Sequence, residues 1–184
     1  MELSSGEKLI LIMLSEIYEH LKIEGDIDPQ MVRTAIFEEQ TWGLAWAYPG
    51  IVGSGENKTP PIVKKVLDIL EMWELLENSY RMLQPADKAR VEIEAEPFGS
   101  DVRFRGFDGN NETEYMAAAG FLVNHLERFP IFKGRDLNSH MPSLDTYGRM
   151  LAVYRSMRNS HDFDLLNAEQ IIKVLKEQAY PEYR

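Results

Sequence analysis

The stretch from Thr59 to Leu83 constrains the fold most, because its apolar residues recur with the period of an α-helix. Thr59 followed by Pro60 is a typical helix start, and Pro85 stands just beyond the point where the pattern ends. A helix this long and one-sided is stable in water only when other elements cover its apolar side. That side is predicted to hold Val63, Val66, Leu67, Leu70, Trp73, Leu76 and Tyr80, with Glu71, Glu74 and Glu77 facing away from it.

Further segments show helix signals of the same kind. Ser4 and Glu7 have the spacing of a capping box, and Asp28 followed by Pro29 marks another start. The apolar stripe of the first helix is wide, which predicts burial on more than one side. We therefore predict an all-α fold, with a single multihelical domain over residues 1–184, five to six main helices and a Gly/Asn-rich central loop. The predicted helices cover residues 5–21, 28–48, 59–83, 86–96 and the stretch from the end of that loop to 128, and others start near residues 143 and 167.

Composition limits the classes of protein and of site. With 184 residues, 44% of them hydrophobic, the chain is long enough for one domain with a sizeable core. It has no cysteine, which excludes disulfides, thiolate metal sites and cysteine nucleophiles. No apolar run reaches the length of about 18 residues that a membrane span needs, and the opening residues lack a basic leader. We predict a cytoplasmic protein that makes no membrane contact.

Charge argues against general nucleic-acid binding. The net charge is −10, whereas a nucleic-acid binder usually carries a basic face. The acidic excess lies in the front of the chain, since residues 1–100 hold 9 basic and 18 acidic residues and residues 101–160 hold 8 and 7. A nucleic-acid-associated regulator is therefore the last alternative, and it would depend on a local basic patch of Arg103, Arg105, Arg128, Lys133 and Arg135.

The central loop lies within residues 104–115. Glycines at 106 and 109 favour a tight turn, and Phe104 and Phe107 would anchor it by pointing inward. Asp108, Asn110 or Asn111 can cap the helix that follows, with Glu112 and Glu114 in its first turn. The alternating oxygen side chains resemble part of an EF-hand loop. However, Thr113 and Ala119 stand where that loop needs Gly and Glu, so an EF-hand is excluded.

A second polar loop, residues 138–142, is expected to pack beside the central loop because both lie next to the ends of one helix. Carboxylate, amide and imidazole groups brought together in this way can bind a small polar ligand or carry out acid–base chemistry. Helix caps and turns use the same residues, so a purely structural role is the competing interpretation. The candidate ligand-binding residues are Arg105, Asp108, Asn110, Asn111, Glu112, Asn138, Ser139 and His140.

No sequence motif assigns a reaction. HExxH, the P-loop, GxGxxG after a strand and GxSxG are all absent, and the histidine spacing predicts no metal site. We predict no cofactor and assign no catalytic residue, which favours a binding protein over an enzyme. The first hypothesis is an oligomeric protein-interaction domain that associates with copies of itself or with another protein. Its support is the wide apolar stripes of residues 5–21 and 59–83 and the small residues 117–120, while a small-ligand binder or enzyme using the two polar loops is the alternative.

A set of motifs spread over most of the chain matches a known pattern. It comprises Phe104-x-Gly106-Phe107-Asp108-Gly109-Asn110-Asn111-Glu112 leading to Tyr115, Arg128-Phe129, Phe132, Asn138-Ser139-His140-Met141-Pro142, Tyr147 and Met150, the stretch from Val66 to Trp73, and the opening Glu7-Lys8-Leu9-Ile10-Leu11. Through these residues the chain resembles the YfbU family, a group of bacterial cytosolic proteins without an assigned reaction. The resemblance implies an all-helical fold, but no substrate, cofactor or catalytic residue.

Overall fold

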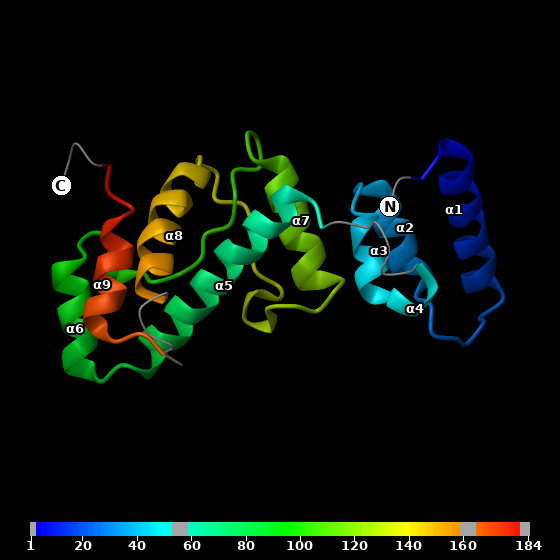
Figure 1. The fold of residues 1–184 in the computed structure, drawn as a ribbon. Helices are drawn as coiled ribbons and strands as arrows, with labels where there is room; N and C mark the ends of the chain where they lie inside the picture. Colours follow the sequence, from blue (N-terminus) through cyan, green and yellow to red (C-terminus); the bar gives the residue numbers. More distant parts are fainter. Residues whose placement is uncertain (1–2, 53–58, 159–164, 181–184) are drawn as a thin grey trace. The chain divides into compact units, whose positions relative to one another are not determined.

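The computed structural model describes residues 3–52, 59–158 and 165–180, which form nine α-helices, two short 3-10 helices and no strand (Figure 1). The all-α prediction is confirmed, whereas the prediction of five to six main helices is not. The elements are α1 (Ser5–His20), α2 (Pro29–Phe37), α3 (Trp42–Ala47), α4 (Pro49–Val52), α5 (Pro61–Met82), α6 (Pro85–Glu94), η1 (Phe98–Ser100), α7 (Thr113–Asn124), η2 (Pro130–Phe132), α8 (Leu144–Arg158) and α9 (Ala168–Lys176).

The chain divides into two compact units, each built from two separate stretches of sequence. The first unit comprises residues 1–64 and 117–134, and the second comprises residues 65–116 and 135–184. A single domain over the whole chain stays a prediction. Within the described ranges, every helix is too short or too polar to cross a membrane.

Three helix starts follow their sequence signals. The Ser4 side chain accepts the N–H of Glu7, and the Glu7 carboxylate accepts the N–H of Ser4, so α1 begins with the predicted capping box. Asp28 caps α2 by accepting two backbone N–H groups. Asn167 and Gln170 form a second capping box at the start of α9. These caps join residues within four positions of each other, which is why the sequence predicts them.

The segment 28–48 was predicted as one helix, and that prediction is wrong. The segment forms α2 and α3, separated by a turn in which Glu39 adopts a positive φ of 59°. Gly43 of α3 packs against the ring of Phe121, and a Cβ atom on Gly43 would lie 2.2 Å from Phe121 Cε1. This close contact joins residues far apart in the sequence, so helical periodicity within the segment cannot reveal it.

The core of the second unit forms around α5. Its predicted apolar stripe is buried except at Leu67 and Tyr80, which are half-buried. Four aromatic rings anchor the stretch before α7 to this core. The ring centroids of Phe104 and Phe107 lie 5.7 Å apart and 5.8 and 5.9 Å from that of Tyr147, and Trp73 lies 6.1 Å from Phe104. Phe104 and Phe107 are 2% and 0% exposed, so their predicted inward orientation is confirmed.

Candidate functional site

The two polar loops predicted from the sequence, the 106–112 loop and the 138–142 loop, meet in the second unit. The N–H of Phe107 donates to the carbonyl oxygen of Leu137 at 2.9 Å, and the N–H of Ser139 donates to the carbonyl oxygen of Phe107 at 2.9 Å. The two backbones run parallel at this point. The expected juxtaposition of the loops is therefore confirmed as direct backbone pairing.

Both glycines of the 106–112 loop permit a close approach to the second loop. Gly106 has a φ of +90°, and a Cβ atom there would lie 1.9 Å from the carbonyl oxygen of Leu137. A Cβ atom on Gly109 would lie 2.7 Å from Asn138 Nδ2, and the N–H of Gly109 donates to Asn138 Oδ1 at 3.0 Å. A larger residue at position 106 would push the two backbones apart, whereas one at position 109 would displace the Asn138 side chain.

The Asp108 carboxylate closes a turn inside its own loop. It accepts the N–H of Asn110 at 3.0 Å and the side-chain amide of Asn111. These hydrogen bonds stabilise the charged form, and they hold the pKa of Asp108 below its ordinary value. Among the described residues, the Asp108 carboxylate bonds to Asn110 and Asn111 of its own loop and not to the N–H groups of α7, so it stabilises the loop and does not cap the helix.

We predict that Asp108→Ala lowers the midpoint of chemical denaturation without changing its slope, because the turn loses both of its carboxylate hydrogen bonds. Asp108→Asn is the matched control. Its amide oxygen can still accept the N–H of Asn110, so this variant should lose less stability than Asp108→Ala. A midpoint for the alanine variant equal to or above that of the parent chain would contradict the structural role.

Glu112 joins the two loops to the start of α8. Its carboxylate, 6% exposed, accepts the N–H groups of Asp108, Ser143 and Leu144 at 2.7 to 2.9 Å and the Ser143 hydroxyl at 2.6 Å. Burial raises the pKa of Glu112, but the hydrogen bonds from the Ser143 hydroxyl and the three N–H groups outweigh burial and lower it. Glu112 was predicted to serve the helix that follows it. It also stabilises the N-terminus of α8, where the helix dipole favours an anion.

The other predicted site residues lie nearer the surface. Arg105 is 65% exposed and pairs with the Asp101 carboxylate. The hydroxyl of Ser139 donates to a backbone carbonyl two residues further on, and His140 is 72% exposed with its imidazole 3.9 Å from Asp136. The polar groups of the two loops thus mostly serve the loops themselves, which favours a structural role. Ligand binding by these residues stays a prediction.

A buried ion pair between Glu77 and Arg135 lies in the second unit and was not predicted from the sequence. The Glu77 carboxylate accepts two guanidinium N–H groups of Arg135 and the N–H of Phe104, all at 2.8 Å. Glu77 is 9% exposed, so the prediction that it faces away from the core is wrong. The signal was present in the sequence, because Glu77 follows Trp73 by four residues and Leu70 by seven, on the same side of the helix as the apolar stripe.

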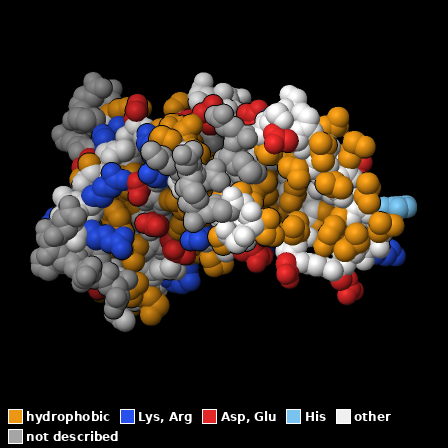
Figure 2. All heavy atoms as spheres, turned by 45° about the vertical axis from the view of Figure 1, so that its right-hand side comes forward, with side chains coloured by type: hydrophobic (Ala, Val, Ile, Leu, Met, Phe, Trp, Pro, Cys, Tyr) orange, Lys and Arg blue, Asp and Glu red, His pale blue; other side chains and the backbone are white. Residues whose placement is uncertain are grey.

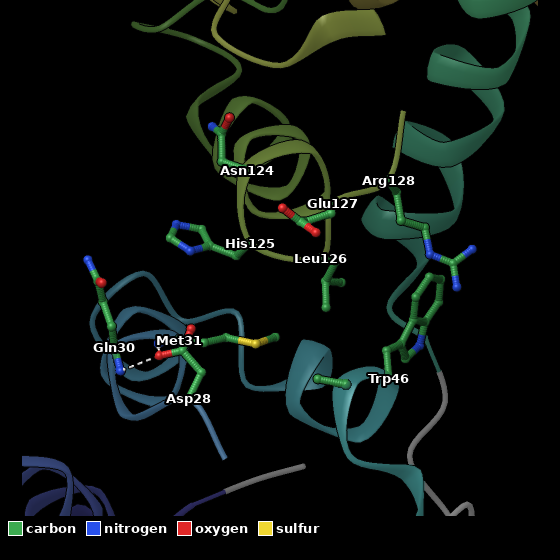
Figure 3. Close-up of a pocket in the computed structure, with 10 residues that line it drawn as sticks. Asp28, Gln30, Met31, Trp46, Asn124, His125, Leu126, Glu127 and Arg128 are labelled. Atoms are coloured by element: carbon green, nitrogen blue, oxygen red, sulfur yellow. Dashed lines mark hydrogen bonds between the residues drawn. The ribbon is translucent and has the colours of Figure 1, made fainter. Parts of the chain in front are cut away.

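A polar hollow of about 590 Å³ lies in the first unit, between the start of α2, α3 and the end of α7 (Figure 3). Its charged groups are already engaged: Asp28 caps α2, Glu127 pairs with Lys133 at 2.7 Å, and the Arg128 guanidinium lies 5.0 Å from the centroid of the Trp46 ring. Across the described residues, no group of three or more acidic or histidine side chains is placed to hold a metal ion. The hollow therefore points to no particular ligand.

An apolar surface on α1 is the other outstanding feature of the first unit. Ser15 lies on the face that α1 packs against α2, and it is 5% exposed. The opposite face, called here the outer face, is 50% to 64% exposed at every apolar position, so the predicted burial of α1 on more than one side is wrong. Hydrophobic side chains gather over this unit in Figure 2. The outer face consists of Leu9, Ile10, Met13, Leu14, Ile17 and Leu21.

A groove of about 490 Å³ adjoins the outer face, and Leu14 and Ile17 belong to both. None of the residues that line it carries a charge. Four helices and the connection between α1 and α2 contribute to its walls. Representative lining residues are Leu14 and Ile17 of α1, Ile23 of the connection, Val32 of α2, Leu44 of α3 and Ile51 of α4. We refer to this feature as the apolar groove.

Comparison with known proteins places the chain in a family. The model of the YfbU domain matches residues 1–176, which takes in both units. The chain is also 32% identical over 179 residues to UPF0304 protein MJECS11 of Methanocaldococcus jannaschii, covering 94% of this chain and 98% of that relative. The match therefore includes the paired loops of the second unit and the apolar surface of the first. The chain belongs to the YfbU family.

Proposed function

We propose that this chain is a protein-interaction module that associates with further copies of itself through the outer face of α1. The observation that carries the proposal is the uneven distribution of exposed apolar side chains. Of the fifteen large hydrophobic side chains exposed in the described residues, ten lie between Leu9 and Ile51. Contiguous apolar patches of this kind usually mark binding surfaces, whereas singly scattered ones need no explanation.

The physical driving force is the removal of this apolar surface from water. Moving a Leu, Ile or Met side chain from full exposure to full burial gains about 1.5–3 kcal/mol, and the side chains of the outer face, 50% to 64% exposed, could gain roughly half of that each. The stripe of α5 no longer supports the proposal, because its side chains are buried or half-buried within the fold. We also propose a cytoplasmic setting. Its support is that the chain holds no cysteine and so cannot form the disulfides typical of proteins in oxidising compartments.

The test is the molar mass of the purified chain by light scattering during size-exclusion chromatography. We expect the parent chain to exceed its monomer mass of 21.2 kDa at micromolar concentration. The double variant Ile10→Glu, Met13→Glu should elute as a monomer, because association would bury its new carboxylates without partners. Both positions are more than half exposed, so the substitutions should leave the fold of the chain intact.

Ile93→Glu is the matched control, because Ile93 is 75% exposed but lies on α6 of the second unit, away from the outer face in the sequence. This variant should keep the molar mass of the parent chain. A monomeric parent chain, or a double variant that keeps the parent's mass, would refute the proposed function.

A further inference from the structure

We propose that the apolar groove is the receptor for the outer face of α1 from a second copy of the chain, and that the two copies exchange this contact reciprocally. This inference rests on the proposed function and names the partner surface. It differs from the simpler arrangement in which two outer faces pack directly on each other.

The outer face has the side-chain spacing that an occupant of such a groove requires. A helix that binds in an apolar groove presents anchors at positions i, i+3, i+4 and i+7. Ile10, Met13, Leu14 and Ile17 have this spacing, and Leu21 continues it by one further turn. On the other helices of the described residues, exposed large hydrophobics occur singly, as with Ile93 of α6, so α1 is the helix with the matching pattern.

The chemistry of the groove also selects an apolar partner. Its lining holds no Lys, Arg, Asp or Glu, so a charged peptide or an anionic ligand would lose its hydration without gaining an ion pair. The six side chains that define the outer face of α1 are likewise uncharged, while Glu16 and His20 lie beside Met13, Ile17 and Leu21. In the proposed contact the apolar side chains enter the groove and Glu16 and His20 remain at its solvent-exposed rim.

The arrangement on one unit is self-complementary. The outer face forms a ridge beside the apolar groove, and the two share Leu14 and Ile17. Two copies can therefore pair about a two-fold axis, with the ridge of each copy entering the groove of the other. A standard interface buries about 800 Å² on each partner, from roughly 20–30 residues, so the arrangement that covers more of the apolar surface is the better candidate for a stable dimer. The reciprocal contact would cover nine of the fifteen exposed large hydrophobics, whereas direct packing of two outer faces would cover six.

Two variants and their mixture distinguish the arrangements. The ridge variant is Ile10→Glu, Met13→Glu, at positions that do not line the groove, and the groove variant is Ile23→Glu, Ile51→Glu, at groove positions 47% and 67% exposed. We expect each variant alone to be monomeric. In an equimolar mixture the groove variant's intact ridge can enter the ridge variant's intact groove, so one of the two contacts is restored. A species of about twice 21.2 kDa should therefore return, at a higher protein concentration than the parent chain needs. Both variants add acidic charge, so attraction between the new charges cannot explain the recovery.

Each outcome decides between the two proposals. A monomeric parent chain would overturn both of them. A self-associating parent with a monomeric ridge variant and an unaffected groove variant would leave the proposed function standing and overturn the reciprocal contact. Two monomeric variants that do not recover on mixing would also overturn it. Circular dichroism must first show parental helicity for each variant, and Ile23→Glu alone replaces the groove variant if that one unfolds.

Discussion

Gly106→Ala should destabilise the second unit by about 4 kcal/mol, since strained backbone and overpacking each typically cost about 1–3 kcal/mol. Gly106 holds a φ of +90°, which an L-residue adopts only with strain. The new Cβ atom would also lie 1.9 Å from the carbonyl oxygen of Leu137 and 2.1 Å from its carbonyl carbon. These are backbone atoms that pair the two polar loops, so they cannot move aside without breaking the pairing. Chemical denaturation of the variant and the parent measures the loss.

Gly134→Ala separates the two causes. Gly134 has a similar φ of +76°, but a Cβ atom added there would meet nothing within 4 Å. This control should therefore show only the cost of strain, about 1–3 kcal/mol. If Gly106→Ala proves no more destabilising than Gly134→Ala, the close approach of the two loops is not the reason for glycine at position 106.

Glu112→Ala is expected to lower the free energy of unfolding by at least about 3 kcal/mol. The substitution removes the acceptor of three backbone N–H groups, and each buried donor left without a partner costs about 1–3 kcal/mol. It also removes the anion at the N-terminus of α8. Glu114→Ala is the control, because Glu114 is exposed in the first turn of α7. Similar stabilities for the two variants would contradict the central role of Glu112.

The same residue predicts a dependence on pH. The folded-state pKa of Glu112 lies below its unfolded value of about 4.3, so its stabilising effect is complete above that pH and is lost as the pH falls through the folded pKa. Between about pH 5 and the folded pKa, the parent chain should therefore lose stability more steeply than Glu112→Ala. Parallel slopes for the two proteins would show that Glu112 does not titrate in this way.

The candidate sites differ in what the sequence could reveal about them. Glycine, aspartate and asparagine in the 106–112 loop indicated a turn, and that local chemistry is what the structure shows. The partners of Glu112 and Glu77 lie 31 and 58 residues away, at Ser143 and Arg135. Helical spacing puts Glu77 on the apolar side, but it was assigned to the other side because charged residues usually face solvent. Here a guanidinium and a backbone N–H compensate for its burial.

The sequence by itself determined the helical class, most helix starts and the residues of the main core. Capping boxes at Ser4 and Asn167 act across three residues, and the stripe of α5 repeats along a single helix, so both need only local information. Tertiary structure decided the close contact of Gly43 in α3 with Phe121 and the exposure of the outer face of α1. An apolar stripe shows that a surface avoids water, but its partner is set by packing between residues distant in the sequence.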